Sequence, residues 1–293
     1  MGAMRRLAPV ALLFAVACGA LPAHAQALSL AYRAGDTFKY SFHSTAKQTM
    51  VAGAITVQAD IEMSAGEVFK VNSVDSSGVA DLSLTLNNVV IKSTTGGISD
   101  TTGGTLKPAT VRPDTAIDIR IAADGRILSI GGNQYVGSNP FLAFSGMGGG
   151  FFVTAVLPST AVKPGDAWSN DYSQPYGDGS GSVKLTSHSK YLRDESLQGV
   201  NAAVVETTSN ASVDITPGTA SEVSAAGGLT GSIKGTVTAD VTTWIDPNGH
   251  RVLKTHSTEI NDGKITLNLS GTVIPGAGPI TMKGTGTTDL ARA

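Results

Sequence analysis

Apolar and polar residues alternate along most of this chain, which is the periodicity of a β-strand with one buried face. The alternation is clearest in four segments, whose apolar positions are Ile55, Val57, Ala59, Ile61 and Met63; Leu82, Leu84 and Leu86; Ile117, Ile119 and Ile121; and Ile265, Leu267 and Leu269. Within each segment these side chains share one face. The pattern therefore predicts a mainly β protein.

Turn-forming residues separate the predicted strands. They cluster at Asp75–Gly78, Asp124-Gly125, Asp246–Gly249 and Asn261–Gly263, which are rich in residues that tolerate tight or left-handed backbone geometry. Helices long enough to cross over between parallel strands are not visible between them. We therefore expect an antiparallel half-open barrel or sandwich with at most one or two short helices.

Two short phrases recur at a spacing of about 125 to 130 residues. Arg33–Phe38 is echoed by Lys163–Trp168, and Asp124–Leu128 is echoed by Asn248–Leu253. The order of the phrases favours two related halves, 26–132 and 161–293, which could also form one continuous sheet. In this scheme Trp168 and Trp244 are expected to be structural residues of the buried layer.

The connector between the halves, residues 133–160, differs in composition from the rest of the chain. It holds a run of three glycines and a concentration of large apolar side chains, namely Phe141, Phe144, Met147, Phe151 and Phe152. One interpretation is a buried plug between two sheet halves. The other is a lid or contact surface for an apolar ligand, because glycines permit hinge motion.

The first 25 residues have the features of an export signal. Arg5 and Arg6 precede a short apolar stretch, and Ala23 and Ala25 place small residues where a signal peptidase cleaves, before Gln26. Cys18, the only cysteine, lies in a sequence similar to a bacterial lipobox, so lipidation of Cys18 is the alternative. The first route gives a periplasmic or extracellular protein and the second an envelope protein anchored by lipid, with peripheral membrane contact only in the second case.

Charge and composition exclude several classes of function. Charged residues are 15% of the chain, and removal of residues 1–25 leaves 19 basic against 23 acidic side chains, which disfavours nucleic acid as a partner. No nucleophile elbow, phosphate-binding glycine loop or convergent set of metal ligands occurs in the sequence. Asp60 and Glu62 are a pair of acids on the polar face of a predicted strand, so we expect a surface position for them. We predict no enzymatic activity and no cofactor.

The turn-and-strand phrases carry a resemblance. The segments 157–168 and 244–253 resemble those of an uncharacterised family of bacterial secreted β-proteins, and the second is also similar to the half-open barrel carriers that move lipoproteins or lipids across the periplasm. The resemblance implies an unclosed barrel with an apolar concave face. The lid helices typical of the carriers are scarcely visible in this sequence.

These observations lead to one expected function and two alternatives. We expect an exported, non-enzymatic envelope protein whose concave sheet face binds a hydrophobic ligand or lipid. A structural or adhesive secreted β-protein with a packed core is the first alternative, and an envelope hydrolase is the second. A carrier requires an internal apolar cavity, whereas an adhesive protein requires only a core.

Overall fold

The computed structural model describes residues 25–53, 55–96, 116–131, 155–175, 181–215, 229–269 and 279–293. These residues form eleven strands and no helix, which confirms the predicted antiparallel β class. The strands are β1 (Thr37–Ala52), β2 (Ile55–Val74), β3 (Ala80–Gly96), β4 (Ile117–Ile121), β5 (Ile127–Gly131), β6 (Ala167–Pro175), β7 (Gly181–Leu197), β8 (Val200–Ile215), β9 (Leu229–Asp246), β10 (Arg251–Leu269) and β11 (Ile280–Arg292).

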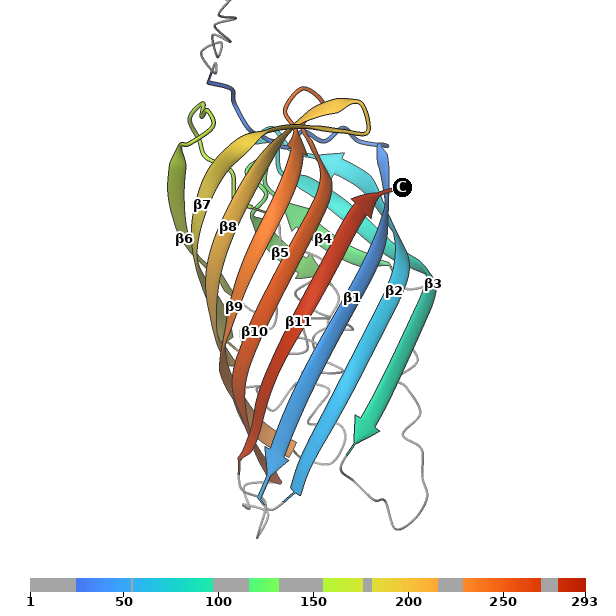
Figure 1. Cartoon of the computed structure of the whole chain (residues 1–293), viewed down its shortest axis with the longest axis vertical. Helices are drawn as coiled ribbons and strands as arrows, with labels where there is room; N and C mark the ends of the chain where they lie inside the picture. The colour runs from blue at the N-terminus through green and yellow to red at the C-terminus, as the bar shows by residue number, and fades with distance from the viewer. Residues whose placement is uncertain are drawn as a thin grey trace, which may run out of the picture.

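All eleven strands belong to one open antiparallel sheet, in the order β5-β4-β3-β2-β1-β11-β10-β9-β8-β7-β6. Strands β1 to β5 form one meander and β6 to β11 form another. The two meanders meet where β1 pairs with β11, in the middle of the sheet (Figure 1). The sheet curls, so that the short strands β4 and β5 lie behind the long central strands. Of the two predicted architectures, the half-open barrel is therefore the better description.

The sheet has an inner face that carries the core and an outer face that is polar. On β1, Tyr40 and Phe42 are buried, whereas Ser41 and His43, which alternate with them, are exposed. The same alternation places Ile117, Ile119 and Ile121 of β4 in the core. These positions follow the apolar periodicity of the sequence, since alternate residues of a strand point to opposite faces.

The core fills one end of the inner face. Strand β4 pairs with only the first part of β3, from Ala80 to Leu84, and β5 pairs with β4. Both short strands pack there together with two segments that are not strands. One of these segments holds Leu28 and Leu30, and the other holds Leu157 and Val162. Backbone hydrogen bonds fasten both segments to the sheet, since Leu30 N donates to Ala123 O at 2.7 Å and Leu157 N to Asp124 O at 2.8 Å. This end of the sheet is thus closed by packed apolar side chains.

The first recurring phrase, Arg33–Phe38, and its echo, Lys163–Trp168, make the same backbone contacts. Gly35 N donates to Val71 O at 2.9 Å, and Gly165 N donates to Tyr191 O at 2.7 Å. Both glycines have positive φ angles, 92° and 98°, which is a conformation that glycine adopts at low cost. In the second turn, the carboxylate of Asp166 also accepts a hydrogen bond from Lys163 N at 2.9 Å. Each phrase therefore sets the start of the first strand of its meander.

One predicted turn is wrong. Asn261–Gly263 lies inside β10, where Asn261 pairs with Gly284 of β11 and Val237 of β9. The outward residue of this segment, Asp262, forms an ion pair with Lys283 at 3.1 Å. Cross-strand partners on both sides satisfy the backbone of these residues, so tertiary pairing overrides their preference for turns.

The two tryptophans occupy different faces of the sheet. Trp168 of β6 packs against the core, and its ring nitrogen donates to Val156 O at 2.7 Å, as expected for a structural residue. Trp244 alternates with the buried Thr243 and Ile245, so it lies on the outer face, and Lys254 Nζ stands 4.8 Å from its ring centroid. The expectation of a buried layer is therefore wrong for Trp244.

This difference predicts unequal effects of truncation. Trp168→Ala is expected to lower the free energy of unfolding by about 3 kcal/mol, because it removes core contacts and leaves a cavity. Trp244→Ala is expected to cost about 1 to 2 kcal/mol, because an outer-face ring over a lysine contributes less. Chemical denaturation of both variants measures the two values. Equal losses would contradict the assignment of the two rings to different faces.

Candidate functional site

The part of the inner face beyond the core is lined by polar side chains. Six of them, contributed by β1, β10 and β11, form what we call the polar patch: Ser44, Gln48, Ser257, Glu259, Asn261 and Thr288. All six are buried, with exposed fractions from 2% to 7%. Buried polar groups require hydrogen-bond partners, so the pairing of each one is informative.

Strand register brings the patch together across β11. Gln48 of β1 and Asn261 of β10 both pair with Gly284, and Glu259 of β10 pairs with Gly286. The two glycines carry no side chain, so they leave room between the long side chains on either side. The Asn261 amide lies over Gly284, where a Cβ atom would stand only 2.7 Å from Asn261 Oδ1. A Cβ atom there would also stand 2.9 Å from the Lys47 carbonyl oxygen, so the backbone of β1 together with Asn261 favours glycine at position 284.

Part of the polar patch is satisfied internally and part is not. The Thr288 hydroxyl donates to Ser44 Oγ at 3.1 Å, and Ser257 hydrogen-bonds to the Glu259 carboxyl group. Gln48 Nε2 and Glu259 Oε1, in contrast, have no hydrogen-bond partner among the described residues. Leaving such groups unpaired costs about 1 to 3 kcal/mol each. These two atoms therefore mark a place where a ligand could supply the missing partners.

Burial changes the acidity of Glu259. It raises the pKa of the carboxyl group to about 7, although the Ser257 hydrogen bond acts in the opposite direction. The charged form is disfavoured because it loses its hydration when buried. Near neutral pH this carboxyl group can consequently act as a hydrogen-bond donor as well as an acceptor.

An apolar surface adjoins the polar patch. We call four side chains the apolar flank: Ile61 and Met63 of β2 and Val89 and Ile91 of β3. Met63 is a buried member of the core cluster, and the other three are partly buried and pack against it. The flank lies next to the patch across the sheet, since Ile61 pairs with Ala46 of β1 and Met63 pairs with Ser44. Beyond Leu84, β3 pairs with no further described strand on its far side. The inner face therefore changes from apolar at the β3 edge to polar at β10.

Glu67 is a second buried acid on the inner face, within the core end. Its side chain is 0% exposed, it pairs across strands with Tyr40 and Leu86, and neither carboxyl oxygen has a hydrogen-bond partner among the described residues. Burial raises the pKa of Glu67 to about 8. Its surroundings are apolar and aromatic, with Tyr40 and Phe69 in an edge-to-face contact at 5.8 Å. Glu67 is therefore a neutral core residue at physiological pH.

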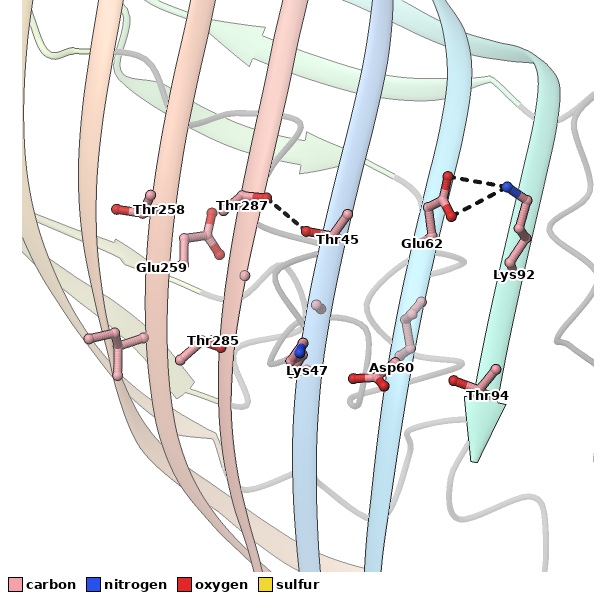
Figure 2. Close-up of a pocket in the computed structure, with 14 residues that line it drawn as sticks. Thr45, Lys47, Asp60, Glu62, Lys92, Thr94, Thr258, Glu259, Thr285 and Thr287 are labelled. Carbon is pink, nitrogen blue, oxygen red and sulfur yellow. Dashed lines mark hydrogen bonds and ion pairs between the residues drawn. The ribbon is translucent and has the colours of Figure 1, made fainter. Parts of the chain in front are cut away.

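The outer face carries a shallow depression of about 660 Å³ across β10, β11, β1, β2 and β3 (Figure 2). Threonines and charged residues line most of it. The hydroxyl oxygens of Thr45 and Thr287 are hydrogen-bonded at 2.8 Å, and Lys92 Nζ forms an ion pair with Glu62 Oε1 at 3.3 Å. Asp60 and Glu62 thus lie at the surface, as expected from the sequence. The depression is open and shallow, so it suits contact with another surface better than enclosure of a ligand.

Histidines and acids of the described residues do not assemble into a metal site. No group of three or more His, Cys, Asp or Glu side chains among them could hold a metal ion. His43 contacts Ser64 at 3.0 Å, and His256 contacts Asp289 at 2.8 Å. These outer-face histidines take part in cross-strand pairs.

The site residues proposed from the sequence lie outside the described residues. They are Cys18 and the connector residues Phe141, Phe144, Met147, Phe151 and Phe152. Sequence reasoning missed Gln48, Glu67, Glu259 and Asn261. One signal is present in the sequence: the alternation of Ile265, Leu267 and Leu269, extended back along the strand, places Glu259 and Asn261 on the apolar face.

No family model and no curated protein matches the sequence. Solved structures that align with it include one of lipovitellin, described for its lipid–protein interactions (13% identity, TM-score 0.46). This alignment covers 89% of the present chain but only 25% of the lipovitellin chain. An outer membrane channel from Pseudomonas putida F1 aligns over 90% of this chain and 97% of its own (7% identity, TM-score 0.31). OprB of Pseudomonas putida aligns over 87% of this chain and 94% of its own (8% identity, TM-score 0.20).

No helix in the described part of the chain has the length and hydropathy needed to cross a membrane.

Proposed function

We propose that this chain is an exported, non-enzymatic protein of the bacterial cell envelope that binds a lipid on the inner face of its open sheet. The observation that carries the proposal is the pairing of the apolar flank with the polar patch. An amphiphile would lay its chain along the partly buried Ile61 and Ile91 and direct its polar group toward Gln48 and Glu259. Among the described strands, none pairs with β3 beyond Leu84 on its far side, which supports entry of the chain from this edge.

The export signal and the resemblance to periplasmic carriers support the compartment. Cleavage before Gln26 would release a protein without cysteine, and lipidation of Cys18 would anchor it. In the structure, Gln26 exchanges two backbone hydrogen bonds with Val162, at 2.8 and 2.9 Å. The residue after the proposed cleavage site thus belongs to the folded part of the protein.

Native mass spectrometry of the protein purified without detergent tests the proposal. We expect a bound amphiphile of a few hundred daltons that dissociates on activation in the gas phase. Ile61→Asp should abolish the adduct, because a carboxylate on the apolar flank is incompatible with an acyl chain. Asp60→Asn, the neighbouring outer-face residue, is the control and should retain it. Bare protein in every preparation, together with no binding of added lipid, would refute the proposal.

The outer depression favours one rival, a structural or adhesive envelope protein. Its threonines and charged pairs suit contact with a polar macromolecule. For this rival, the inner face would be only a core, so Ile61→Asp would alter stability and no copurified lipid would exist. The same experiment therefore separates the two functions.

A further inference from the structure

The polar patch contains information on the head group of the ligand, and the following inference rests on the proposed function. Two of its atoms are buried without a partner among the described residues. Gln48 Nε2 is a hydrogen-bond donor, and Glu259 Oε1 accepts a hydrogen bond. A head group that satisfies both must supply an acceptor and a donor.

The spacing of these two side chains sets the size of the head group. Gln48 and Glu259 lie on strands that are separated by β11 and are offset by two residues along it, so their backbones are roughly 12 Å apart. The Asn261 amide covers Gly284 between them, whereas the side of Gly286, next to Glu259, carries no side chain. A single atom cannot bridge this separation, whereas a small polyol can place one hydroxyl near each side chain.

The charge of the patch argues against ionic head groups. No lysine or arginine is among the buried side chains of the described residues, so these residues supply no counter-ion for a buried phosphate or carboxylate. An anionic head group would also lie next to the carboxylate of Glu259 whenever Glu259 is ionised. An ammonium group supplies only donors and would leave Gln48 Nε2 unpaired. Hydroxyl groups donate and accept, and they carry no charge.

We propose that the polar patch selects an uncharged, hydroxyl-bearing head group, so that the ligand of the inner face is a neutral acylglycerol. The acyl chain lies on the apolar flank. The glycerol hydroxyls accept from Gln48 Nε2 and donate to Glu259 Oε1. Because the patch is shielded from bulk water, these hydrogen bonds contribute more than they would at an exposed surface.

Three amphiphiles with the same oleoyl chain test the head group on the full chain at pH 7.4. The probes are monooleoylglycerol, oleate and oleoyl lysophosphatidate, each below its critical micelle concentration. We expect monooleoylglycerol to bind at least about tenfold tighter than the two anions, because anion burial here is uncompensated. Binding is followed by native mass spectrometry and by displacement of a fluorescent fatty-acid probe.

Variants of the two unpartnered residues complete the test. Gln48→Leu and Glu259→Leu should each weaken monooleoylglycerol binding about tenfold, as expected for the loss of one hydrogen bond in a shielded site. Glu259→Gln keeps an acceptor oxygen and should retain most of the affinity. Glu62→Gln, on the outer face, is the matched control. Thermal unfolding of every variant shows whether a loss of binding reflects a loss of fold.

Each result decides a different claim. Preference for monooleoylglycerol that both leucine variants remove supports the acylglycerol assignment. Equal binding of all three probes, or tighter binding of an anion, overturns the head-group inference and leaves lipid binding in place. Failure of all three probes to bind the folded wild-type protein overturns the proposed function and the inference together.

Discussion

Replacing Glu67 with glutamine is expected to raise the free energy of unfolding by about 3 to 5 kcal/mol at pH 8 to 9 and to leave it nearly unchanged at pH 4. The side chain is fully buried, and burial raises the pKa of its carboxyl group to about 8 from an ordinary value of 4.5. Between pH 4.5 and about pH 8, Glu67 is protonated in the folded protein and ionised in the unfolded chain. Wild-type stability therefore falls as the pH rises from about 4.5 to 8, and glutamine removes this contribution.

Urea denaturation at pH 4, 6, 8 and 9 measures the effect. Glu62→Gln is the matched control, because it makes the same chemical change on the outer face of β2, where Glu62 pairs with Lys92. Exposed pairs of this kind contribute at most about 1 kcal/mol. In Glu67→Gln a smaller slope should remain between about pH 4.5 and 7, because burial also raises the pKa of Glu259. Parallel stability curves for wild type and Glu67→Gln would show that Glu67 is ionised in the folded protein.

Leu84→Ala is expected to destabilise the protein by about 3 to 5 kcal/mol, because the side chain is fully buried and its removal leaves a cavity. Leu84 pairs with Phe69 of β2 on one side and with Ile117 of β4 on the other. It is the last residue of β3 that pairs with β4. The substitution should therefore also loosen the short strands that close the core end.

Two measurements separate these effects. Chemical denaturation gives the global loss, with Thr85→Ala as a control for a change on the other face of the same strand. Hydrogen exchange should accelerate in β4 and β5 more than in β8 and β9, since elements with little pairing open locally first. Uniform acceleration across the sheet would mean that β4 and β5 unfold only with the whole domain.

The fold was predictable where burial follows the apolar periodicity. Ile117, Ile119 and Ile121 lie in the core as their spacing indicates, and Asp124-Gly125 and Asp246–Gly249 form turns between strands. Backbone propensity and burial agree at these positions, so local sequence is sufficient. The strand order was not predictable in the same way, because the pairing of β1 with β11 depends on residues about 250 positions apart.

The candidate site was hidden because its residues contradict the same rules. Asn261 stands in a phrase typical of turns, yet it lies in the middle of β10. Glu259 is buried beside an exposed Ile260, and Glu67 is buried without a partner among the described residues. Sequences depart from such local rules most often at functional or strained positions. Only the register across β11 shows that Gln48, Glu259 and Asn261 share one patch.

The pairing of β1 with β11 has a consequence for the order in which the protein can fold. Each meander is built from neighbouring strands and can form through local hairpins, but the seam requires the last strand to be synthesised. Contacts between distant residues form slowly, because a long loop must close first. The nascent chain therefore carries two separate half-sheets with open central edges until its end is released. An open strand edge of this kind can pair with other chains, so the protein is most vulnerable to aggregation before the seam closes.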